Sequence, residues 1–306
     1  MSRVAVLEGG RSLERQVSLK SGARVKDALE RLGHEVLAVD SDEELVDRLR
    51  DARPDAAFIA LHGRDGEDGT VQELLELLGI PYTGSRVSAC LRASDKALAK
   101  HALRDAGIPT PDFFAFTETA FRELGAAGAL PEIEARLTFP LVVKPAVQGS
   151  ALGIKFARDA EAVPSALMAA FSYDRKVVLE RHVPGRDLAV SVLDGQVLPI
   201  VEAMVPGGDP YDFEARYEIG RTEFACPADL PGRVATRVGD VARAAWQALG
   251  LSGFARVDLM LAGDEPFVLE ANAVPGLTET SLLPQAAEAA GISFEQLIER
   301  VLALAA

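Results

Sequence analysis

Two neighbouring apolar runs near the end of the chain, residues 254–261 and 267–272, constrain the fold more than any other stretch. Each has the alternation typical of a strand, and Gly263, Asp264 and Pro266 between them favour a chain reversal. If the two strands pair, one face is apolar and carries Ala255, Val257, Leu259, Leu261, Phe267, Leu269 and Ala271. The opposite face then gathers polar side chains, which include Arg256, Asp258, Glu270 and Asn272.

The polar face of this strand pair has the composition of a metal site. Two carboxylates and an amide oxygen are hard ligands that suit Mg²⁺, which usually completes its shell with water and phosphate oxygens. The pattern therefore favours a metal–nucleotide site. A solvated polar face explains the same alternation equally well, so both interpretations stay open on this stretch alone.

The composition is that of a globular chain without a general affinity for polyanions. Of the 306 residues, 48% are hydrophobic and 25% charged, which suits two or three packed domains. The net charge of -14 argues against broad binding to nucleic acid or an anionic membrane. Cys90 and Cys226 lie far apart and indicate neither a disulfide framework nor a zinc site, as expected in a reducing cytosol. The apolar run 4–7 is too short for a signal-peptide core, and we expect no membrane span.

The first third of the chain alternates strands with helices. Strands are expected at 4–7, 35–39 and 56–61, and helices at 15–32, 43–49 and 71–78. This order predicts a parallel sheet with helices on both faces, whose ligands bind beyond the carboxyl ends of the strands. The loops 9–14 and 62–69 follow two of these ends and should face one crevice. The first loop lacks the G-x-G-x-x-G pattern, so a dinucleotide site is weakly supported.

The remainder is expected to contain an antiparallel α+β region. Strands are expected at 140–145, from 154, and at 176–181, 187–193 and 196–202, with helices at 95–105, 159–171 and 233–249. Residues 205–223 lack periodicity and have a composition typical of a lid or a disordered loop. Ser293 and Gln296 have the spacing of a capping box at the start of a last helix.

Several polar residues lie where a phosphate or a nucleotide would bind. The loop 149–153 follows a strand that carries Lys144 and suits phosphate, although an ordinary hairpin turn fits the spacing better. Lys96 is either a second phosphate lysine or a solvated side chain at a helix start. Glu180 and Asp187 suit an adenine and a ribose, or else form a charged strand end.

Glu14 and His62 have the same ambiguity. Glu14 lies in the first helical turn, where its charge suits the helix dipole and Ser12 could cap the helix. His62 follows a strand, where a lone histidine more often hydrogen-bonds its own loop. Binding of an ammonium group by Glu14 needs support from elsewhere.

Taken in order, these segments resemble the D-alanine–D-alanine ligases of the ATP-grasp superfamily over essentially the whole chain. The resemblance rests on residues 9–18, 61–69, 81–84, 95–96, 144–145, 149–150, 211–217, 256–258 and 270–276. Each motif is weak alone, but their order is highly specific. It implies an α/β and α+β chain with an ATP-grasp fold behind an N-terminal parallel-sheet domain. The implied units are an N-terminal substrate domain, a central ATP-grasp subdomain and a C-terminal subdomain with the metal and acceptor sites, at 1–94, 95–185 and 186–306.

The resemblance implies ATP-dependent joining of two D-alanines for peptidoglycan synthesis. The carboxylate of the first D-alanine would attack the γ-phosphate to give an acyl phosphate, and the amine of the second would displace phosphate. ATP, two Mg²⁺ or Mn²⁺ ions and two D-alanine molecules are the implied ligands. The implied state is a cytoplasmic homodimer, with neither nucleic acid nor membrane as a partner.

The resemblance also implies roles for individual residues. The catalytic set would be Glu14 on the substrate ammonium, Ser150 and Tyr217 in a lid network, and Arg256 and the Gly276 N–H at the oxyanion. The two D-alanines would contact Val17, His62, Ser281 and Leu282. The nucleotide would contact Lys96, Lys144, Ser150, Glu180, Arg181, Val183, Asp187, Arg216 and Met260. The metal ligands would be Asp258, Glu270 and Asn272.

Some positions depart from the usual family pattern, namely Gln16, Val147, Gln148, Ala151, Asp187, Arg216 and Ala273. They bear on affinity and lid kinetics more than on reaction type. Tyr217 is retained, and relatives that favour D-lactate tend to lack it, so we expect an amine acceptor. The alternatives are a D-alanine–D-lactate or other amino-acid ligase, and an ATP-grasp module that binds nucleotide without catalysis.

Overall fold

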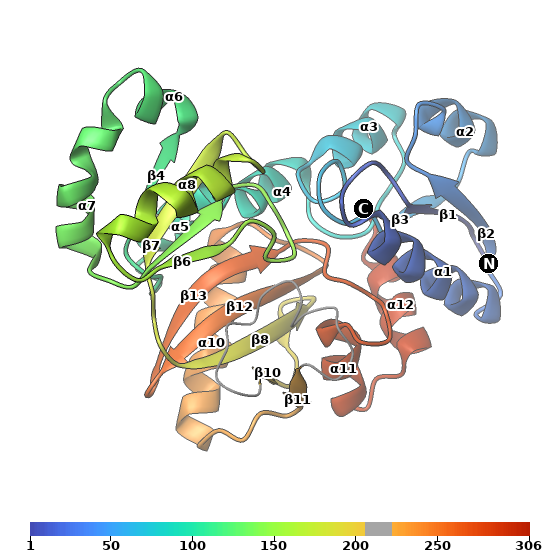
Figure 1. Cartoon of the computed structure of the whole chain (residues 1–306). Coiled ribbons are helices and arrows are strands. Elements are labelled where there is room, and N and C mark those ends of the chain that lie inside the picture. Colours follow the sequence, from blue (N-terminus) through green and yellow to red (C-terminus); the bar gives the residue numbers. More distant parts are fainter. Residues whose placement is uncertain (206–221) are drawn as a thin grey trace.

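The structure, a computed structural model, describes residues 1–205 and 222–306. Its N-terminal part is a parallel sheet in the order β2-β1-β3 (Figure 1), formed by β1 Arg3–Glu8, β2 Glu35–Asp40 and β3 Ala56–Ile59. Residues 4–7 of the central strand are completely buried, as expected of a parallel strand covered on both faces. The helices between and after these strands are α1 Arg15–Arg31, α2 Leu45–Ala52 and α3 Thr70–Leu78. The predicted order of elements is confirmed.

A second sheet is antiparallel and has the order β4-β7-β5-β6. Its strands are β4 Phe113–Thr117, β5 Leu141–Pro145, β6 Lys155–Ala157 and β7 Lys176–Arg181. Around it lie α6 Glu118–Arg122, η1 Ala126–Ala129, α7 Leu130–Leu137, η2 Ala160–Ala162 and α8 Val163–Phe171. The predicted antiparallel α+β region is confirmed, whereas β4, α6 and α7 were not predicted.

The third sheet is also antiparallel, in the order β11-β10-β8-β12-β13, with β9 paired to β8. Its strands are β8 Arg186–Leu193, β9 Gln196–Val197, β10 Val201–Met204, β11 Glu223–Ala225, β12 Phe254–Ala262 and β13 Glu265–Asn272. Helix α10 Gly232–Ala248 packs on it. The single strand expected at 196–202 is wrong, because Pro199 lacks an N–H for pairing and separates β9 from β10.

The predicted pairing of β12 with β13 is confirmed, but the predicted faces of β13 are partly wrong. Asp258 lies opposite Glu270 whereas Leu259 lies opposite Val268, so Leu269 is an extra residue in a β-bulge. The bulge reverses the alternation, and Val268 rather than Phe267 or Leu269 joins the apolar core. In Figure 1 this strand pair lies next to β8 in the third sheet, below the second sheet.

The end of the chain returns to the N-terminal sheet. Helices α11 Leu282–Ala289 and α12 Phe294–Ala303 complete the fold, and the predicted capping box of Ser293 and Gln296 is present. Ala306 exchanges backbone hydrogen bonds of 3.3 and 3.4 Å with Tyr82, and Figure 1 shows the C-terminus beside the N-terminal elements. The loop between β13 and α11 lies against α1, where Arg24 donates to the Leu277 carbonyl at 2.7 Å.

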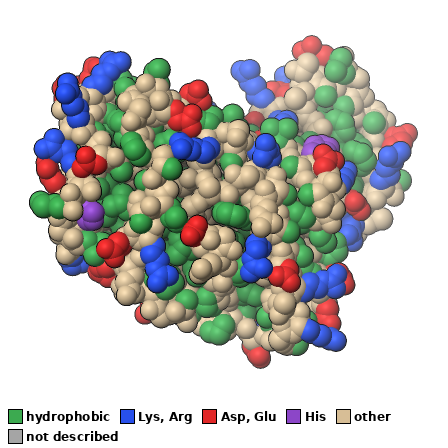
Figure 2. Space-filling view, turned by 180° about the vertical axis from the view of Figure 1, so that it is seen from behind, with side chains coloured by type: hydrophobic (Ala, Val, Ile, Leu, Met, Phe, Trp, Pro, Cys, Tyr) green, Lys and Arg blue, Asp and Glu red, His purple; other side chains and the backbone are tan. Residues whose placement is uncertain are grey.

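Two helices connect the first sheet to the second. They are α4 Val87–Ser94, which was not predicted, and α5 Lys96–Asp105, which was. On the face seen in Figure 2, acidic and basic side chains are interspersed with apolar and polar ones. Among the described helices, none combines the length and the apolar composition needed to cross a bilayer.

Candidate active site

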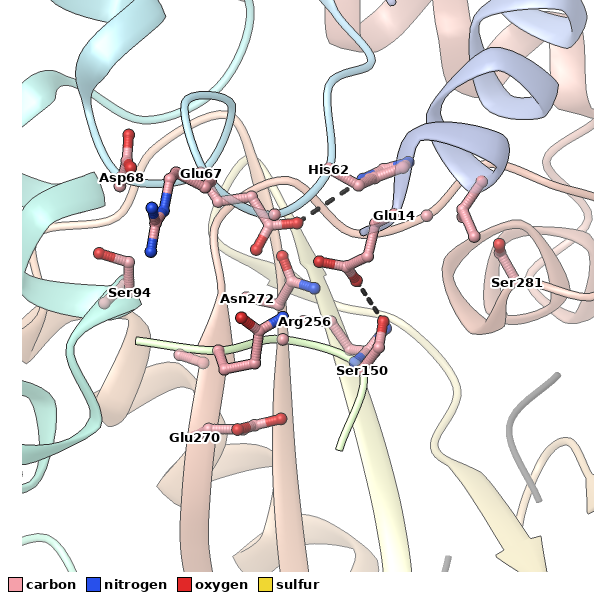
Figure 3. Close-up of a pocket in the computed structure, with 18 of the residues that line it drawn as sticks. Glu14, His62, Glu67, Asp68, Ser94, Ser150, Arg256, Glu270, Asn272 and Ser281 are labelled. Carbon is pink, nitrogen blue, oxygen red and sulfur yellow. Dashed lines mark hydrogen bonds and ion pairs between the residues drawn. The ribbon is translucent and has the colours of Figure 1, made fainter. Parts of the chain in front are cut away.

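Residues predicted for the site from all three parts of the chain line one cavity (Figure 3). The predicted residues that line it are Glu14, Val17, His62, Lys96, Ser150, Arg256, Glu270, Asn272, Gly276, Ser281 and Leu282. The cavity has a volume of about 120 Å³. This is below the roughly 300–1,000 Å³ of typical small-molecule pockets. Its enclosed part therefore suits an amino acid better than a whole nucleotide.

Glu14 is held at one wall of this cavity. Its carboxylate accepts a hydrogen bond from the Ser150 hydroxyl, and Figure 3 shows the two side chains pointing toward each other. Backbone passes so close that a Cβ at Gly63 or Gly149 would lie 2.4 or 2.9 Å from a Glu14 oxygen. Glu14 is 6% exposed, and burial followed by the nearby charge of Glu67 raises its pKa. A cationic ligand would relieve this unfavourable burial of negative charge.

The Ser12 side chain does not cap α1 as expected. Its hydroxyl accepts the Glu14 N–H at 3.1 Å and donates to the His62 carbonyl at 2.7 Å. It therefore joins the two loops that follow β1 and β3. The expectation that these loops face one crevice is confirmed, because residues of both line the cavity.

His62 joins the N-terminal helix to the loop after β13. Its Nδ1 lies 3.1 Å from the Val274 carbonyl oxygen, and its Nε2 lies 2.9 Å from Oγ of Ser21. Since a carbonyl only accepts, Nδ1 carries the proton and Nε2 accepts from Ser21. Ser21 also accepts the Leu277 N–H at 3.2 Å. His62 therefore holds the loop that carries Gly276 in place, besides lining the cavity.

The polar face of β12 and β13 is buried at Arg256 and Asp258 and half-buried at Glu270 and Asn272. Arg256 is 9% and Asp258 5% exposed, and the guanidinium donates to both carboxylate oxygens at 2.6 and 2.8 Å. Register places Glu270 beside Asp258, and Asn272 beside Arg256. The prediction that these four side chains gather on one face is confirmed, and the solvated-face alternative is wrong.

The donor set of this face fits a divalent cation. A carboxylate has about four lone-pair sites, and Arg256 occupies two of those on Asp258. The Asn272 amide oxygen accepts the Val274 N–H at 3.0 Å and keeps a second lone pair. Within residues 1–205 and 222–306, no cluster of three His, Cys, Asp or Glu forms a metal site by itself. Substrate oxygens would therefore have to complete the shell, as is usual for Mg²⁺.

Lys96 lies between this carboxylate face and the glycine loop. Its Nζ donates to the Gln148 carbonyl at 2.8 Å and lies 3.2 Å from Oε2 of Glu270. The side chain is 6% to 7% exposed, so it is not the solvated lysine of the alternative interpretation. An anion bound at the base of this loop would therefore lie close to the buried ammonium group of Lys96.

A second group of predicted residues lies outside the lining of this cavity, on the second and third sheets and the segment between them: Lys144, Glu180, Arg181, Val183, Asp187, Asp258 and Met260. Asp187 and Met260 are cross-strand partners, so their side chains share a face. Phe267 pairs with Met260 and lies on the same face, with the Arg181 guanidinium 5.9 Å from its ring centre. These residues offer an apolar surface with a charged edge.

At the end of β7, Glu180 is enclosed by two lysines. Its oxygens lie 2.6 Å from Nζ of Lys144 and 2.8 Å from Nζ of Lys100. Burial alone raises the pKa of Glu180, but the two ammonium charges outweigh it and leave the pKa below its usual value. Glu180 is therefore an ionised acceptor. It does lie at the charged end of β7, as in the alternative interpretation, but its side chain is buried.

Two stretches of the chain match the models of one protein family. Residues 43–85 match the D-ala D-ala ligase N-terminus and residues 102–303 match the D-ala D-ala ligase C-terminus. The D-alanine--D-alanine ligase of Syntrophotalea carbinolica is 45% identical over 301 residues, which cover 98% of this chain and 95% of that protein. This chain belongs to the D-alanine–D-alanine ligase family.

Other members of the family agree over the full length. The D-alanine--D-alanine ligase of Moorella thermoacetica is 43% identical, and the match covers 99% of both chains. The crystal structure of the Bacillus anthracis D-alanine--D-alanine ligase complexed with ATP has a TM-score of 0.85 and 35% identity, and covers 99% of this chain and 97% of that one. The crystal structure of the VanG D-Ala:D-Ser ligase of Enterococcus faecalis has a TM-score of 0.83 and 27% identity. The match covers 99% of this chain and 98% of that one. The expected ATP-grasp fold is confirmed.

Some residues of this ligase family member were not predicted for the site, and others lie outside the described residues. Glu67 lines the cavity 3.7 Å from Nδ1 of His62, Lys100 contacts Glu180, and Phe267 is the cross-strand partner of Met260. No spacing in the sequence marks them. Arg216 and Tyr217, with nearly all of the expected lid at 205–223, fall in the part that the structure does not describe.

Proposed function

We propose that this protein is an ATP-dependent ligase that joins two D-alanines into D-alanyl-D-alanine for peptidoglycan synthesis. One observation carries the proposal. A single cavity brings a buried carboxylate, Glu14, together with the buried cations Lys96 and Arg256 and with the oxygen donors Glu270 and Asn272. An amino acid needs one carboxylate for its ammonium and cations for its carboxylate, and phosphoryl transfer needs cations around the phosphate.

The reaction takes place in two steps. A carboxylate oxygen of the first D-alanine attacks the γ-phosphorus of ATP, the bond to the β–γ bridging oxygen breaks, and ADP leaves. The product is an acyl phosphate. The amine of the second D-alanine attacks the acyl carbon, loses a proton and expels inorganic phosphate, which leaves a peptide bond.

The first D-alanine is bound by the N-terminal loops. Glu14 pairs with its ammonium group, Ser150 holds the Glu14 carboxylate, and Val17 and His62 line the pocket. Arg256 and the Gly276 N–H stabilise the oxyanion that develops on the acyl carbon. Tyr217 belongs to the same network with Glu14 and Ser150 in our proposal.

The second D-alanine is bound at the start of α11. Ser281 is the N-cap residue and Leu282 the first residue of this helix. A helix N-terminus offers backbone N–H groups and a positive dipole end to an anion. We therefore assign the carboxylate of the second D-alanine to Ser281 and Leu282.

The nucleotide lies between the second and third sheets. The phosphates contact Lys96, Lys144, Arg216 and the loop that carries Ser150. The adenine is held by Glu180, Arg181 and Val183 and packs on Met260, and Asp187 binds the ribose. Two Mg²⁺ or Mn²⁺ ions at Asp258, Glu270 and Asn272 would neutralise charge on the transferred phosphate.

The wider assignments belong to the same proposal. We place the protein in the cytoplasm as a homodimer, with units at 1–94, 95–185 and 186–306. Each of the three sheets falls within one of these ranges, which supports the division. Acceptor choice is open to test, because one structural relative is named as a D-Ala:D-Ser ligase.

Phosphate release with ATP, Mg²⁺ and D-alanine, compared with L-alanine, tests the function. We expect D-alanine to drive phosphate release and formation of the dipeptide. D-Serine and D-lactate as sole second substrates, assayed over a pH series, distinguish an amine from a hydroxyl acceptor. Binding of ATP without any D-alanine-dependent turnover would instead identify a non-catalytic nucleotide-binding module.

A further inference from the structure

A buried lysine, Lys100 of α5, connects the second and third sheets, between which we place the nucleotide. Its side chain is 0% exposed, its Nζ lies 2.8 Å from Oε2 of Glu180 on β7, and it donates to Oγ1 of Thr110 at 2.7 Å. The Thr110 hydroxyl donates to the Val268 carbonyl of β13 at 2.8 Å, next to the bulge. A chain of polar contacts thus runs from the second sheet to the third.

The two lysines at Glu180 differ in their surroundings. Lys100 is closed in by Thr110 and by the Phe113 ring, whose centre lies 5.4 Å from its Nζ. Lys144 lies on β5, whose end leads into the glycine loop, and its Nζ donates to Oε1 of Glu180 at 2.6 Å. Lys100 is 0% exposed, whereas Lys144 is 4% exposed and lies on the strand that leads into the loop.

The charges around Glu180 also differ from a simple ion pair. One carboxylate between two ammonium groups leaves an excess positive charge in a buried place, which favours the arrival of an anion. When a phosphate arrives, Lys144 can pair with it while Lys100 keeps Glu180 neutralised. Without Lys100, pairing of Lys144 with the phosphate would leave the Glu180 carboxylate without a counter-ion.

We propose that Lys100 is the permanent counter-ion of Glu180 and acts as a positioning residue for adenine recognition, while Lys144 is the partner that exchanges to the phosphate. The proposal rests on the proposed function, in which Glu180 accepts a hydrogen bond from the adenine amino group. Lys100 itself does not touch the nucleotide. It keeps the Glu180 carboxylate ionised and in position to accept the hydrogen bond from the adenine.

The charge state of Lys100 gives the proposal a pH dependence. The charged groups that face Lys100 are Glu180 on β7, Lys144 on β5 and Arg104 on α5 itself. Burial lowers the pKa of Lys100 from 10.5 to about 8, although the Glu180 charge opposes this. As the pH rises through about 8, the folded protein loses this proton, and the preference for adenine should weaken.

The test compares ATP with inosine triphosphate, whose base carries a carbonyl in place of the amino group. The ratio of kcat/KM for the two nucleotides is measured with D-alanine in the wild type, Lys100→Met, Thr110→Val and Arg104→Met. Arg104 is the matched control, because it is a cation on the same helix, lies 4.5 Å from the same Phe113 ring and does not contact Glu180.

We expect Lys100→Met to lower the preference for ATP about tenfold or more, as for a lost hydrogen bond to a charged group. Thr110→Val should lower it less, and Arg104→Met should leave it unchanged, with the KM for D-alanine constant throughout. In the wild type the preference should fall above a pH of about 8, the pKa of Lys100, and this fall should be absent in Lys100→Met.

An equal loss with both nucleotides, or an unchanged ratio, would make Lys100 a purely structural residue and overturn the proposal. If Lys100→Met does not fold, the ratio in Thr110→Val decides by the same criterion. Calorimetric binding of both nucleotides gives the ratio even if D-alanine drives no phosphate release. Phosphate release therefore tests the proposed function, and the ratio of the two nucleotide affinities tests the role of Lys100 independently.

Discussion

Replacement of Glu14 by glutamine should have opposite effects on activity and on stability. Glutamine keeps an oxygen that can accept the Ser150 hydroxyl but removes the charge that would pair with the ammonium of the first D-alanine. The cavity wall around Glu14 leaves 6% of the residue exposed, so water cannot replace the lost partner. A hydrogen bond to a charged group contributes about 1.5–3 kcal/mol.

The expected loss in kcat/KM for the first D-alanine is therefore about 10- to 150-fold, because about 1.4 kcal/mol corresponds to a factor of ten. Stability should change the other way. Burial and the charge of Glu67 raise the pKa of Glu14, so its ionised form is unfavourable in the folded protein. Glu14→Gln should therefore increase the free energy of unfolding at neutral pH.

The pH dependence follows from the direction of this shift. Since the folded pKa lies above the ordinary value of 4.5, the penalty is absent below pH 4.5 and complete only above the folded pKa. The stability difference between wild type and Glu14→Gln should vanish as the pH falls toward 4.5. Wild-type kcat/KM should decline in acid at a higher pH than an ordinary carboxylate would give.

Steady-state kinetics and urea unfolding over a pH series measure both effects. Glu30→Gln on the same helix is the control, because Glu30 is exposed, pairs with Lys26 and does not line the cavity. Near-normal kcat/KM in Glu14→Gln, or a loss of stability at neutral pH with no change in activity, would refute the assignment of Glu14 to the substrate ammonium.

Three further perturbations test other parts of the site. Glu270→Gln should lower D-alanine-dependent phosphate release by about 10²-fold or more, because it removes charge that phosphoryl transfer needs, while circular dichroism and Tm show that the fold persists. Ser21→Ala should lower the free energy of unfolding by about 2 kcal/mol in urea titrations, because it leaves His62 Nε2 and the Leu277 N–H unpaired. Residues 147–152 should gain protection in hydrogen exchange when an ATP analogue and Mg²⁺ bind, together with 205–223.

Matched variants separate these effects from general damage. Glu265→Gln changes an exposed carboxylate on the same strand as Glu270 and should leave turnover unchanged. Ser172→Ala removes an exposed serine hydroxyl and should not alter unfolding. Full activity in Glu270→Gln, equal unfolding of Ser21→Ala and wild type, or unchanged exchange at 147–152 would each count against the corresponding assignment.

The sequence predicts the N-terminal sheet well because its strands are continuous apolar runs. Residues 4–7 are apolar and fully buried, and the glycine turns that follow them leave little choice of chain direction. The strand pair that carries Arg256 and Glu270 is equally clear, since alternation and a reversal define both strands. Family resemblance then turns several ambiguous polar positions into a coherent set of expectations.

What the sequence does not reveal depends on contacts between distant segments. The extra residue Leu269 carries no local signal, yet it places Phe267 on the same face as its partner Met260. In the sequence, Lys100 has no feature that distinguishes it from other helical lysines. Its burial is explained only by the Glu180 carboxylate, which approaches from β7. The helix 87–94 has eight residues, about two turns, which is too short for periodicity to mark it, so its packing determines it.

The most direct measurement follows oxygen from the first substrate. D-Alanine labelled with ¹⁸O in its carboxylate is incubated with ATP and Mg²⁺, and the released phosphate is analysed by mass spectrometry. Because the carboxylate oxygen that attacks the γ-phosphorus leaves with the phosphate, we expect one ¹⁸O atom in each phosphate. Unlabelled phosphate formed together with the dipeptide would contradict activation of D-alanine as an acyl phosphate.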